Sequence, residues 1–437
     1  MLEFSLILLL GLAVGVLVGL LPGVPAYIGP LLLYPFLGSM SVDQILAFWL
    51  ASHIGSQYFG SVAAILLKIP GEASSLIYIN DIGKLTIADR LALVRQTAWG
   101  STVGSILSLL VVLAFYYSGL TTELVQLTSN NIKLSLLTIL IVTLCWFTNH
   151  KRLSLLLFFI GFFFAEKTNQ DLPQWVFSMQ EYTTDITLFS LILGFLIIPE
   201  FITEVTKQHV GDRVSTTSAQ VKEPLNIKAM SRGTWLGSLI GLIPGPSHIL
   251  SGIISYNSYK KDDIKSKIIS AESANNSATI TSLMPFLYIG IPITLSEFLL
   301  NDLLQVKLFM IPHDFLSAWP AWHSINFIEL CFIIIAVSTL IYHFLAQKFL
   351  GMYENFLELA YKKLKLIFIA LIAYLIYVDV TFNPVYIIPY LTFLLILSWI
   401  GYHLSRRNVN VLPLIFGFIL GDMISWSLYQ FYQIYFY

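Results

Sequence analysis

Long apolar runs recur along the whole chain, and their lengths predict helices that cross a membrane. A helix needs about 20 apolar residues, each rising about 1.5 Å, to span the hydrocarbon of a bilayer. The runs lie roughly at 4–37, 44–69, 97–118, 132–148, 153–165, 187–200, 233–256, 275–300, 325–347, 364–378, 385–403 and 410–428. The run 153–165 is short and predicts a partial or tilted span. We therefore expect an all-α polytopic membrane protein with roughly 10–12 membrane segments.

Composition supports this expectation and removes other classes of protein. The 437 residues are 57% hydrophobic and 11% charged, with a mean hydropathy of +0.78. Because a soluble domain carries about 25% charged residues, a soluble enzyme is excluded. The net charge of −1 gives no basic excess for nucleic acid. Cys145 and Cys331 lie in apolar runs and are expected to be buried thiols. The N-terminus lacks a basic segment, which predicts a first membrane segment and not a cleavable signal.

Basic residues gather in alternate loops, and this alternation predicts a topology. They lie at Lys84–Arg95, Lys151–Arg152, 201–232, Lys260–Lys267, Lys348–Lys365 and Arg406–Arg407. The loops between them, 119–131, 166–186, 301–323 and 379–384, are poor in basic residues. Short loops rich in Lys and Arg stay cytoplasmic. We therefore expect a multi-pass protein of the cytoplasmic (cell) membrane with its N-terminus outside. Segment 201–232, the long polar stretch, is expected to be a cytoplasmic linker between membrane halves 1–200 and 233–437.

The two halves share the positions of glycine and proline. Gly15, Gly19 and Pro22-Gly23 correspond to Gly237, Gly241 and Pro244-Gly245 at one offset of 222 residues. The same offset relates Pro70 to Pro292 and Ser74 to Ser296. Because glycine and proline are tied to special backbone geometry, their shared register indicates a duplication.

The charge pattern predicts that the two repeats are inverted. The first repeat starts outside and reaches the basic loop 84–95, whereas the second starts inside and reaches 301–323. The run 233–256 has basic residues on both flanks, which predicts a re-entrant helical hairpin with Pro244-Gly245 at its tip. By symmetry, 4–37 should be a hairpin with Pro22-Gly23 at its tip. A membrane helix broken at Pro70-Gly71 or Gly290–Pro292 follows each hairpin. Inverted repeats with broken helices are typical of secondary transporters.

Such breaks are suited to binding an anion. The half-helix after a break offers free N–H groups and a positive dipole end, and the opposing end offers carbonyl groups to a cation. The predicted substrate-binding residues are Pro22, Gly23, Lys68, Pro70, Gly71, Ser74, Ser75, Pro244, Gly245, Asn275, Asn276 and Pro292. A Na⁺ site is expected near Asn275, Asn276 and Gly290, without catalytic residues or another cofactor beyond coupled Na⁺ or H⁺.

Several of these residues have alternative interpretations. Lys68 either reaches the membrane interface or is a fixed ammonium beside the first break; a charge at the bilayer centre costs about 2.5–3.5 kcal/mol. Asn275 and Asn276 either bind ligand or cross-link helices. His53 and His248 are expected to form structural hydrogen bonds. Asp81 is a helix cap or an ion ligand, and Glu272 is either functional or solvated at the inner face.

At these motifs the sequence resembles the large membrane subunit of tripartite tricarboxylate transporters, the TctA family. The matching stretches are Gly19–Gly23, Tyr58–Leu67, Ile69–Ser75, Asp81, Gly194–Glu200, Gly241–Gly245, Glu272–Asn276, Gly290–Pro292 and Gly417–Gly421. The chain departs from the family at Lys68, where Asn is usual, and at Ile82, where Gly is usual. It is also shorter than the usual subunit, which indicates a short, divergent member.

The resemblance implies a permease that moves small, tricarboxylate-type organic acids by secondary active transport, driven by a cation gradient. It also implies two partners, a small membrane subunit and a periplasmic or extracellular binding protein. The alternatives are a membrane-embedded enzyme, for which the chain offers few intramembrane acids or histidines, and a channel or structural subunit.

Overall fold

The architecture comes from a computed structural model, in which the described part of the chain is helical and contains no strand. The described residues are 2–21, 24–33, 36, 40–68, 73–119, 138–139, 141–142, 145–146, 148, 150–165, 187–206, 223–243, 247–260, 262–289, 292–304, 327–348, 359, 363–382, 387–407 and 409–436.

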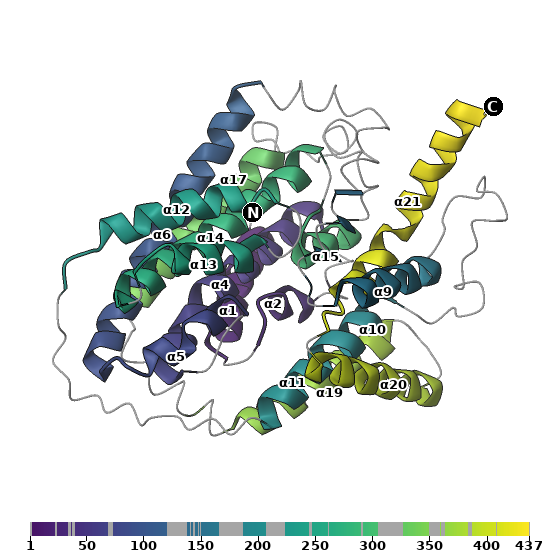
Figure 1. Ribbon diagram of the computed structural model, residues 1–437, viewed down its shortest axis with the longest axis horizontal. Coiled ribbons are helices and arrows are strands. Elements are labelled where there is room, and N and C mark those ends of the chain that lie inside the picture. The colour runs from purple at the N-terminus through teal and green to yellow at the C-terminus, as the bar shows by residue number, and fades with distance from the viewer. Residues whose placement is uncertain are drawn as a thin grey trace. The chain divides into compact units, whose positions relative to one another are not determined.

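The helices follow one another along the chain as the apolar runs predict (Figure 1). They are α1 (Leu2–Leu20), α2 (Ile28–Leu31), α4 (Val42–Leu67), η1 (Ala73–Ile77), α5 (Ile79–Ile82), α6 (Ile87–Tyr117), α9 (Lys151–Phe164), α10 (Leu188–Ile192), η3 (Leu193–Ile197), α11 (Ile198–Thr206), α12 (Ile227–Ile240), α13 (Ser247–Asn257), α14 (Ile264–Ile289), α15 (Leu295–Leu303), α17 (Phe327–Lys348), α19 (Leu364–Phe382), α20 (Ile387–Arg406) and α21 (Leu412–Phe436).

Within the described residues, four helices are long and apolar enough to cross a membrane: Glu3–Leu20, Ile87–Tyr117, Glu329–Lys348 and Ile387–Arg406. Shorter apolar helices lie at Leu188–Thr203 and Leu412–Gly421. Large apolar side chains cover outward faces, for example Leu9 on α1 and Trp399 on α20. Lipid can cover such faces, whereas water would not. The prediction of a multi-pass helical membrane protein is therefore confirmed.

The chain forms two compact units, and each takes residues from both sequence halves. Unit 1 comprises Met1–Thr121 and His209–Leu364, and unit 2 comprises Thr122–Gln208 and Lys365–Tyr437. Half of the expected linker 201–232, from residue 207 to residue 222, lies outside the described residues. Both cysteines, Cys145 in unit 2 and Cys331 in unit 1, are buried free thiols as expected.

In unit 1, two helices of equal length lie at the offset that relates the glycine and proline positions. α4 and α14 each have 26 residues; their starts differ by 264 − 42 = 222 and their ends by 289 − 67 = 222. The next described element after each of them is a short helical segment, η1 after α4 and α15 after α14. The offset of 222 residues that relates the glycine and proline positions therefore also relates the bounds of α4 and α14.

The same correspondence governs how the flanking helices pack. Three glycines of α1, Gly11, Gly15 and Gly19, each face the α4 backbone, at Phe48, Ser52 and Ser56. Gly233 and Gly237 of α12 and Gly241, which caps its C-terminus, face Ser270, Ala274 and Ala278 of α14, and all six positions match at 222. A Cβ at Gly11 or Gly19 would lie 2.8 Å from a carbonyl oxygen of α4. Only glycine permits this close helix approach.

Unit 2 is also assembled on close contacts at glycine. Gly161 of α9 and Gly417 of α21 each face the backbone of the other helix, at Leu414 and Phe158. Gly401 of α20 faces the backbone of η3 at Phe195. The Phe201 and Phe368 rings stack 4.2 Å apart. The unit therefore consists of tightly crossed apolar helices.

Candidate functional site

One face of α14 is polar and buried, although the helix belongs to the core of unit 1. Glu272, Asn275, Asn276, Thr279 and Ser282 follow the 3- and 4-residue spacing of a helix face, and all five are buried. The helix tolerates them partly because the Thr279 hydroxyl donates to the carbonyl of Asn275 at 3.0 Å. Buried polar groups need partners, so this face is held by specific contacts with neighbouring helices.

Asn275 and Asn276 reach two different helices of the first repeat. Asn275 Nδ2 donates to Gln57 Oε1 of α4 at 3.0 Å. Asn276 Nδ2 donates to Ser101 Oγ of α6 at 2.9 Å and to the Glu272 carbonyl at 3.0 Å. The two asparagines thus join α14 to α4 and α6 at the centre of unit 1.

A second polar contact links α4 to α15. His53 Nδ1 shares a hydrogen bond with Ser296 Oγ at 3.2 Å, and His248 of α13 acts electrostatically on His53. His53 and Asn275 occupy equivalent positions, since 275 − 53 = 222. The expectation that His53 forms a hydrogen bond is confirmed. The two equivalent helices therefore bring amide and imidazole groups into one buried region of unit 1.

The N-terminus of α15, which follows the helix interruption expected at Gly290–Pro292, is capped by a buried carboxyl group. Glu297 Oε2 accepts the N–H groups of Ile293 at 2.7 Å and Thr294 at 3.1 Å. The Glu297 side chain is only 1% exposed, and its Oε1 has no hydrogen-bond partner among the described residues. Pro292, at the break itself, is buried.

The structure describes six of the twelve predicted substrate residues: Lys68, Ser74, Ser75, Asn275, Asn276 and Pro292. Pro22, Gly23, Pro70, Gly71, Pro244 and Gly245, as well as Gly290 of the expected Na⁺ site, lie outside the described residues. Ser74 and Ser75 are buried in η1, which packs on α13. The β-carbon of Ser74 lies 3.7 Å from where a Cβ on Gly252 would stand. η1 therefore places Ser74 beside α13, which belongs to the second half of the sequence.

Lys68 ends α4 in a left-handed backbone conformation. Its φ and ψ are 59° and 29°, and its N–H donates to the Ala64 carbonyl at 3.1 Å. It has the one positive φ among non-glycine residues in the described part of the chain. Left-handed conformations are unfavourable for a residue with a Cβ, so this position is held by the structure around it.

Asp81 belongs to an ionic cluster that joins the two repeats. It accepts hydrogen bonds from Lys84 and from the Tyr256 hydroxyl, and Lys267 Nζ lies 3.7 Å from Asp81 Oδ2. Lys267 also lies over the Tyr256 ring, 4.0 Å from its centroid. The hydrogen bonds from Lys84 and Tyr256 hold the pKa of Asp81 below its ordinary value. Asp81 is thus an ion-pair residue, and the described part of the chain does not use it as a helix cap.

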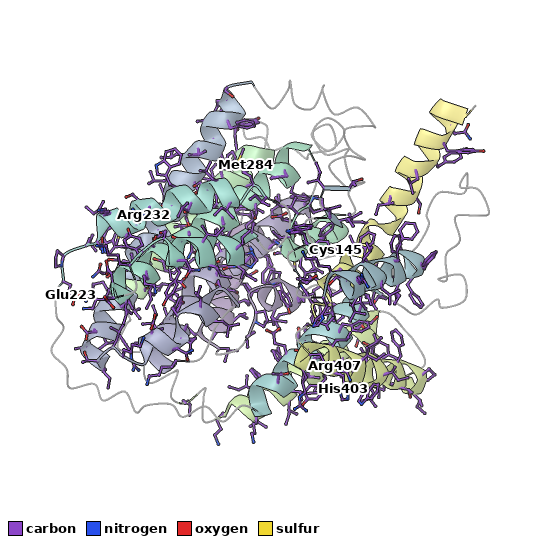
Figure 2. All side chains as sticks on the ribbon, in the orientation of Figure 1. Cys145, Glu223, Arg232, Met284, His403 and Arg407 are labelled. Carbon is purple, nitrogen blue, oxygen red and sulfur yellow. The ribbon has the colours of Figure 1, made fainter. Side chains whose placement is uncertain are left out.

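Two further contacts extend this junction along α14. Lys265 pairs with Asp89 at 2.8 Å and with Glu223, which precedes α12. The Tyr78 hydroxyl donates to Glu272, and both side chains are buried, so Glu272 is not solvated. Figure 2 labels Glu223 near the start of α12 and Met284 near the end of α14.

Sequence reasoning missed Gln57, Ser101, Tyr78 and Glu297. Glu297 carried a signal that could have been used, since it is the one charged residue in the apolar run 275–300. An ionisable residue in such a run marks a functional position by default. Gln57 and Ser101 are ordinary polar residues whose partners lie 218 and 175 positions away, so no local pattern identifies them.

The fold and this buried polar junction define a multi-pass helical membrane protein with a polar core. Residues 6–416 match the model of the tripartite tricarboxylate transporter TctA family. The chain belongs to this family, which is a family of membrane transporters.

Two relatives from Agrobacterium vitis are similar to the chain. One is an uncharacterized 52.8 kDa protein in the TAR-I ttuC′ 3′ region, 25% identical over 453 residues, covering 95% of this chain and 84% of that protein. The other is an uncharacterized protein in the TAR-II ttuC′ 3′ region, 28% identical over 208 residues, covering 43% of this chain and 78% of that protein. No solved structure matches the chain.

Proposed function

We propose that this chain is the permease of a tripartite system that carries small, tricarboxylate-type organic acids across the cytoplasmic membrane by secondary active transport. A gradient of Na⁺ or H⁺ drives the movement. A small membrane subunit and an extracytoplasmic binding protein are its partners. Family membership supports the class of transporter, and the remaining steps rest on the geometry of unit 1.

The observation that carries the proposal is the contact between the two equivalent helices, through Asn275 and Gln57 at 3.0 Å. In an inverted-repeat transporter, substrate sites lie at the interface of the repeats, next to discontinuous helices. Here α4 and α14 meet through buried amides, and each is followed by a break and a short helical segment. This arrangement supports two inverted repeats, with α12 and α13 as the arms of one re-entrant hairpin and α1 and α2 in the other.

The proposed substrate site combines amides, hydroxyl groups and helix ends. Asn275 and Asn276 offer amide groups, and Ser74 and Ser75 offer hydroxyl groups beside the first break. In this proposal the N–H groups after Pro70-Gly71 and Pro292 complete the anion site. Pro22-Gly23 and Pro244-Gly245, which lie outside the described residues, are the proposed hairpin tips that line it. Hydrogen bonds to ionised oxygens are about twice as strong as neutral ones, which suits this donor set to carboxylates.

The charge pattern supports the orientation. The cluster of Asp81, Lys84, Lys265 and Lys267 lies at the N-terminal end of α14. With basic loops on the cytoplasmic side, this cluster closes the inner end of unit 1, and the N-terminus of the chain is outside.

The test is uptake of labelled mono-, di- and tricarboxylates into proteoliposomes, first with this chain alone and then with both partners. We expect saturable uptake that depends on a Na⁺ or H⁺ gradient. Asn275→Ala should reduce carboxylate uptake at least tenfold through lost contacts of about 1.4 kcal/mol or more. Thr392→Ala, an exposed change on α20, is the matched control. Uptake that does not saturate, or that needs no gradient, would instead indicate a channel.

A further inference from the structure

One oxygen of the buried Glu297 carboxyl group, Oε1, accepts no hydrogen bond from the described residues. Its Oε2 accepts two backbone N–H groups, whereas its Oε1 has no hydrogen-bond partner in the described part of the chain. The side chain is 1% exposed. A buried acceptor without a partner is costly, and an ionised carboxylate without a counter-charge is costlier still.

One polar side chain of a neighbouring helix also contacts the Glu297 carboxyl group. The Ser282 hydroxyl of α14 is close enough to interact with the Glu297 carboxyl group. However, Ser282 donates its own hydrogen to the Thr279 carbonyl at 3.1 Å. The single hydroxyl hydrogen of Ser282 is thus shared between two acceptors, and Glu297 Oε1 keeps no hydrogen-bond partner among the described residues. A proton on the carboxyl group adds a donor to this contact.

No basic side chain of the described residues pairs with Glu297. On α4, His53 is engaged by Ser296, the residue before Glu297. On α13, His248 acts on His53. On α14, the titratable side chains that the structure describes are Lys265, Lys267 and Glu272, which lie at least ten residues before Ser282, about 15 Å along the helix. The described residues thus provide no counter-charge for an ionised Glu297 carboxylate.

We propose that Glu297 is the proton-coupling residue, and that its protonation is what lets a carboxylate substrate reach the N-terminus of α15. This inference rests on the proposed function, because it assigns the coupling ion of the same site. The proton binds Oε1, and the new O–H group donates to Ser282 Oγ. The proton is taken up from water on the side from which the substrate enters. It is released to water on the other side of the membrane.

The geometry explains why proton and substrate would travel together. The N–H groups of Ile293 and Thr294 are the first donors after the second break, and ionised Glu297 already occupies them. A substrate carboxylate at this point would meet a buried like charge. Neutral Glu297 removes that charge and is a weaker acceptor, which frees the N–H groups for the substrate. Substrate binding and protonation are then coupled, and each increases the affinity for the other.

Glu297→Gln is the decisive variant, because the amide keeps an oxygen for both N–H groups but cannot titrate. Glu329→Gln is the matched control. It also removes a glutamate from the first turn of an apolar helix, α17, where the carboxylate accepts a hydrogen bond from Tyr117. Each protein is reconstituted with its small membrane subunit and binding protein, with labelled citrate as the probe.

For the wild-type chain and Glu329→Gln, a pH gradient should drive citrate accumulation. The apparent Kd for citrate should rise about tenfold per pH unit where Glu297 of the empty carrier is ionised. Glu297→Gln should keep citrate exchange between equal pools, lose accumulation driven by the pH gradient, and show a flat pH profile. Accumulation that persists in Glu297→Gln overturns the proposal, and so does wild-type uptake that follows Na⁺ alone.

A second measurement requires no substrate. Infrared difference spectra of the purified chain should show a protonated-carboxyl band that grows from mildly alkaline to mildly acidic pH. Glu329→Gln should keep this band and Glu297→Gln should lose it; a band that survives in Glu297→Gln overturns the assignment. If citrate is not carried at all, the proposed function and the symport fail together. The infrared band then still decides whether Glu297 is a proton site.

Discussion

At the scale of single residues, the core of unit 1 contains hydrogen bonds between buried polar groups that lie far apart in the sequence. Asn275 and Gln57 illustrate this, since both are buried and they share a hydrogen bond of 3.0 Å. Leaving one buried hydrogen-bonding group unsatisfied costs about 1–3 kcal/mol. The contact therefore stabilises the pairing of α4 with α14 mainly by penalising alternatives.

This pairing predicts a non-additive double mutant. Gln57→Ala and Asn275→Ala should each lower the free energy of unfolding by about 1–3 kcal/mol, whereas the double variant should lose less than the sum. The measurement is unfolding of the purified chain in detergent, followed by helical circular dichroism. Thr392→Ala should change it little. Additive losses would show that the two side chains are not coupled.

Asp81 predicts a stability difference that depends on pH. Because its pKa is lowered in the fold, first by Lys84 and then by Tyr256, ionised Asp81 stabilises the folded chain above its ordinary pKa of about 4. That contribution is lost as the pH falls through the lower folded value. Asp81→Asn should cost about 1 kcal/mol at neutral pH, since the site is partly exposed to solvent. Thermal midpoints of the two proteins should converge in acid; a constant gap would contradict the ionic explanation.

At the scale of helices, the three-glycine faces of α1 and α12 set how closely the equivalent pairs approach. Each glycine faces the backbone of α4 or α14 at the matching position. The shared contact explains why Gly15, Gly19, Gly237 and Gly241 recur at one offset in the sequence. It also adds a third pair, Gly11 and Gly233, which the sequence pattern alone had not singled out.

A methyl group at these positions should separate the helices. Gly19→Ala places a Cβ 2.8 Å from the Ser56 carbonyl oxygen, and Gly237→Ala places one 2.7 Å from Ala274 Cα. Each should cost about 1–3 kcal/mol by overpacking. Gly252→Ala on α13 is the control, because its nearest neighbours are 3.7 Å away and alanine favours helix. Thermal unfolding in detergent should show two losses and one neutral or stabilising change.

The sequence could predict what depends on composition and local pattern, and not what depends on distant pairing. Apolar runs were enough for the membrane class, and the offset of 222 anticipated the equal lengths of α4 and α14. The contact of Asn276 with Ser101 could not be anticipated, because it requires knowing that α14 lies on α6. The capping role of Glu297 depends on the backbone at a break, where pattern alone does not fix the direction of N–H groups.

At the scale of the whole molecule, the relative direction of the two repeats is the property on which the proposed mechanism depends. Inverted repeats place equivalent positions on opposite sides of the membrane, whereas parallel repeats place them on the same side. The starts of α4 and α14 provide such a pair. Ser41 precedes α4, and Asp263, 222 residues later, accepts the Ser266 N–H at 3.2 Å.

Labelling from each side of the membrane tests this directly. Met40 and Asp262 are equivalent positions, since 262 − 40 = 222. The substitutions Met40→Cys and Asp262→Cys leave the residues that begin α4 and α14 unchanged. The background carries Cys145→Ser and Cys331→Ser, which removes the two buried thiols. An impermeant maleimide should label Met40→Cys in intact cells and Asp262→Cys only after the membrane is opened. Lys84→Cys should behave as Asp262→Cys does, because both belong to basic loops. Labelling of Met40→Cys and Asp262→Cys from the same side would refute inversion, and alternating access would then need another structural basis.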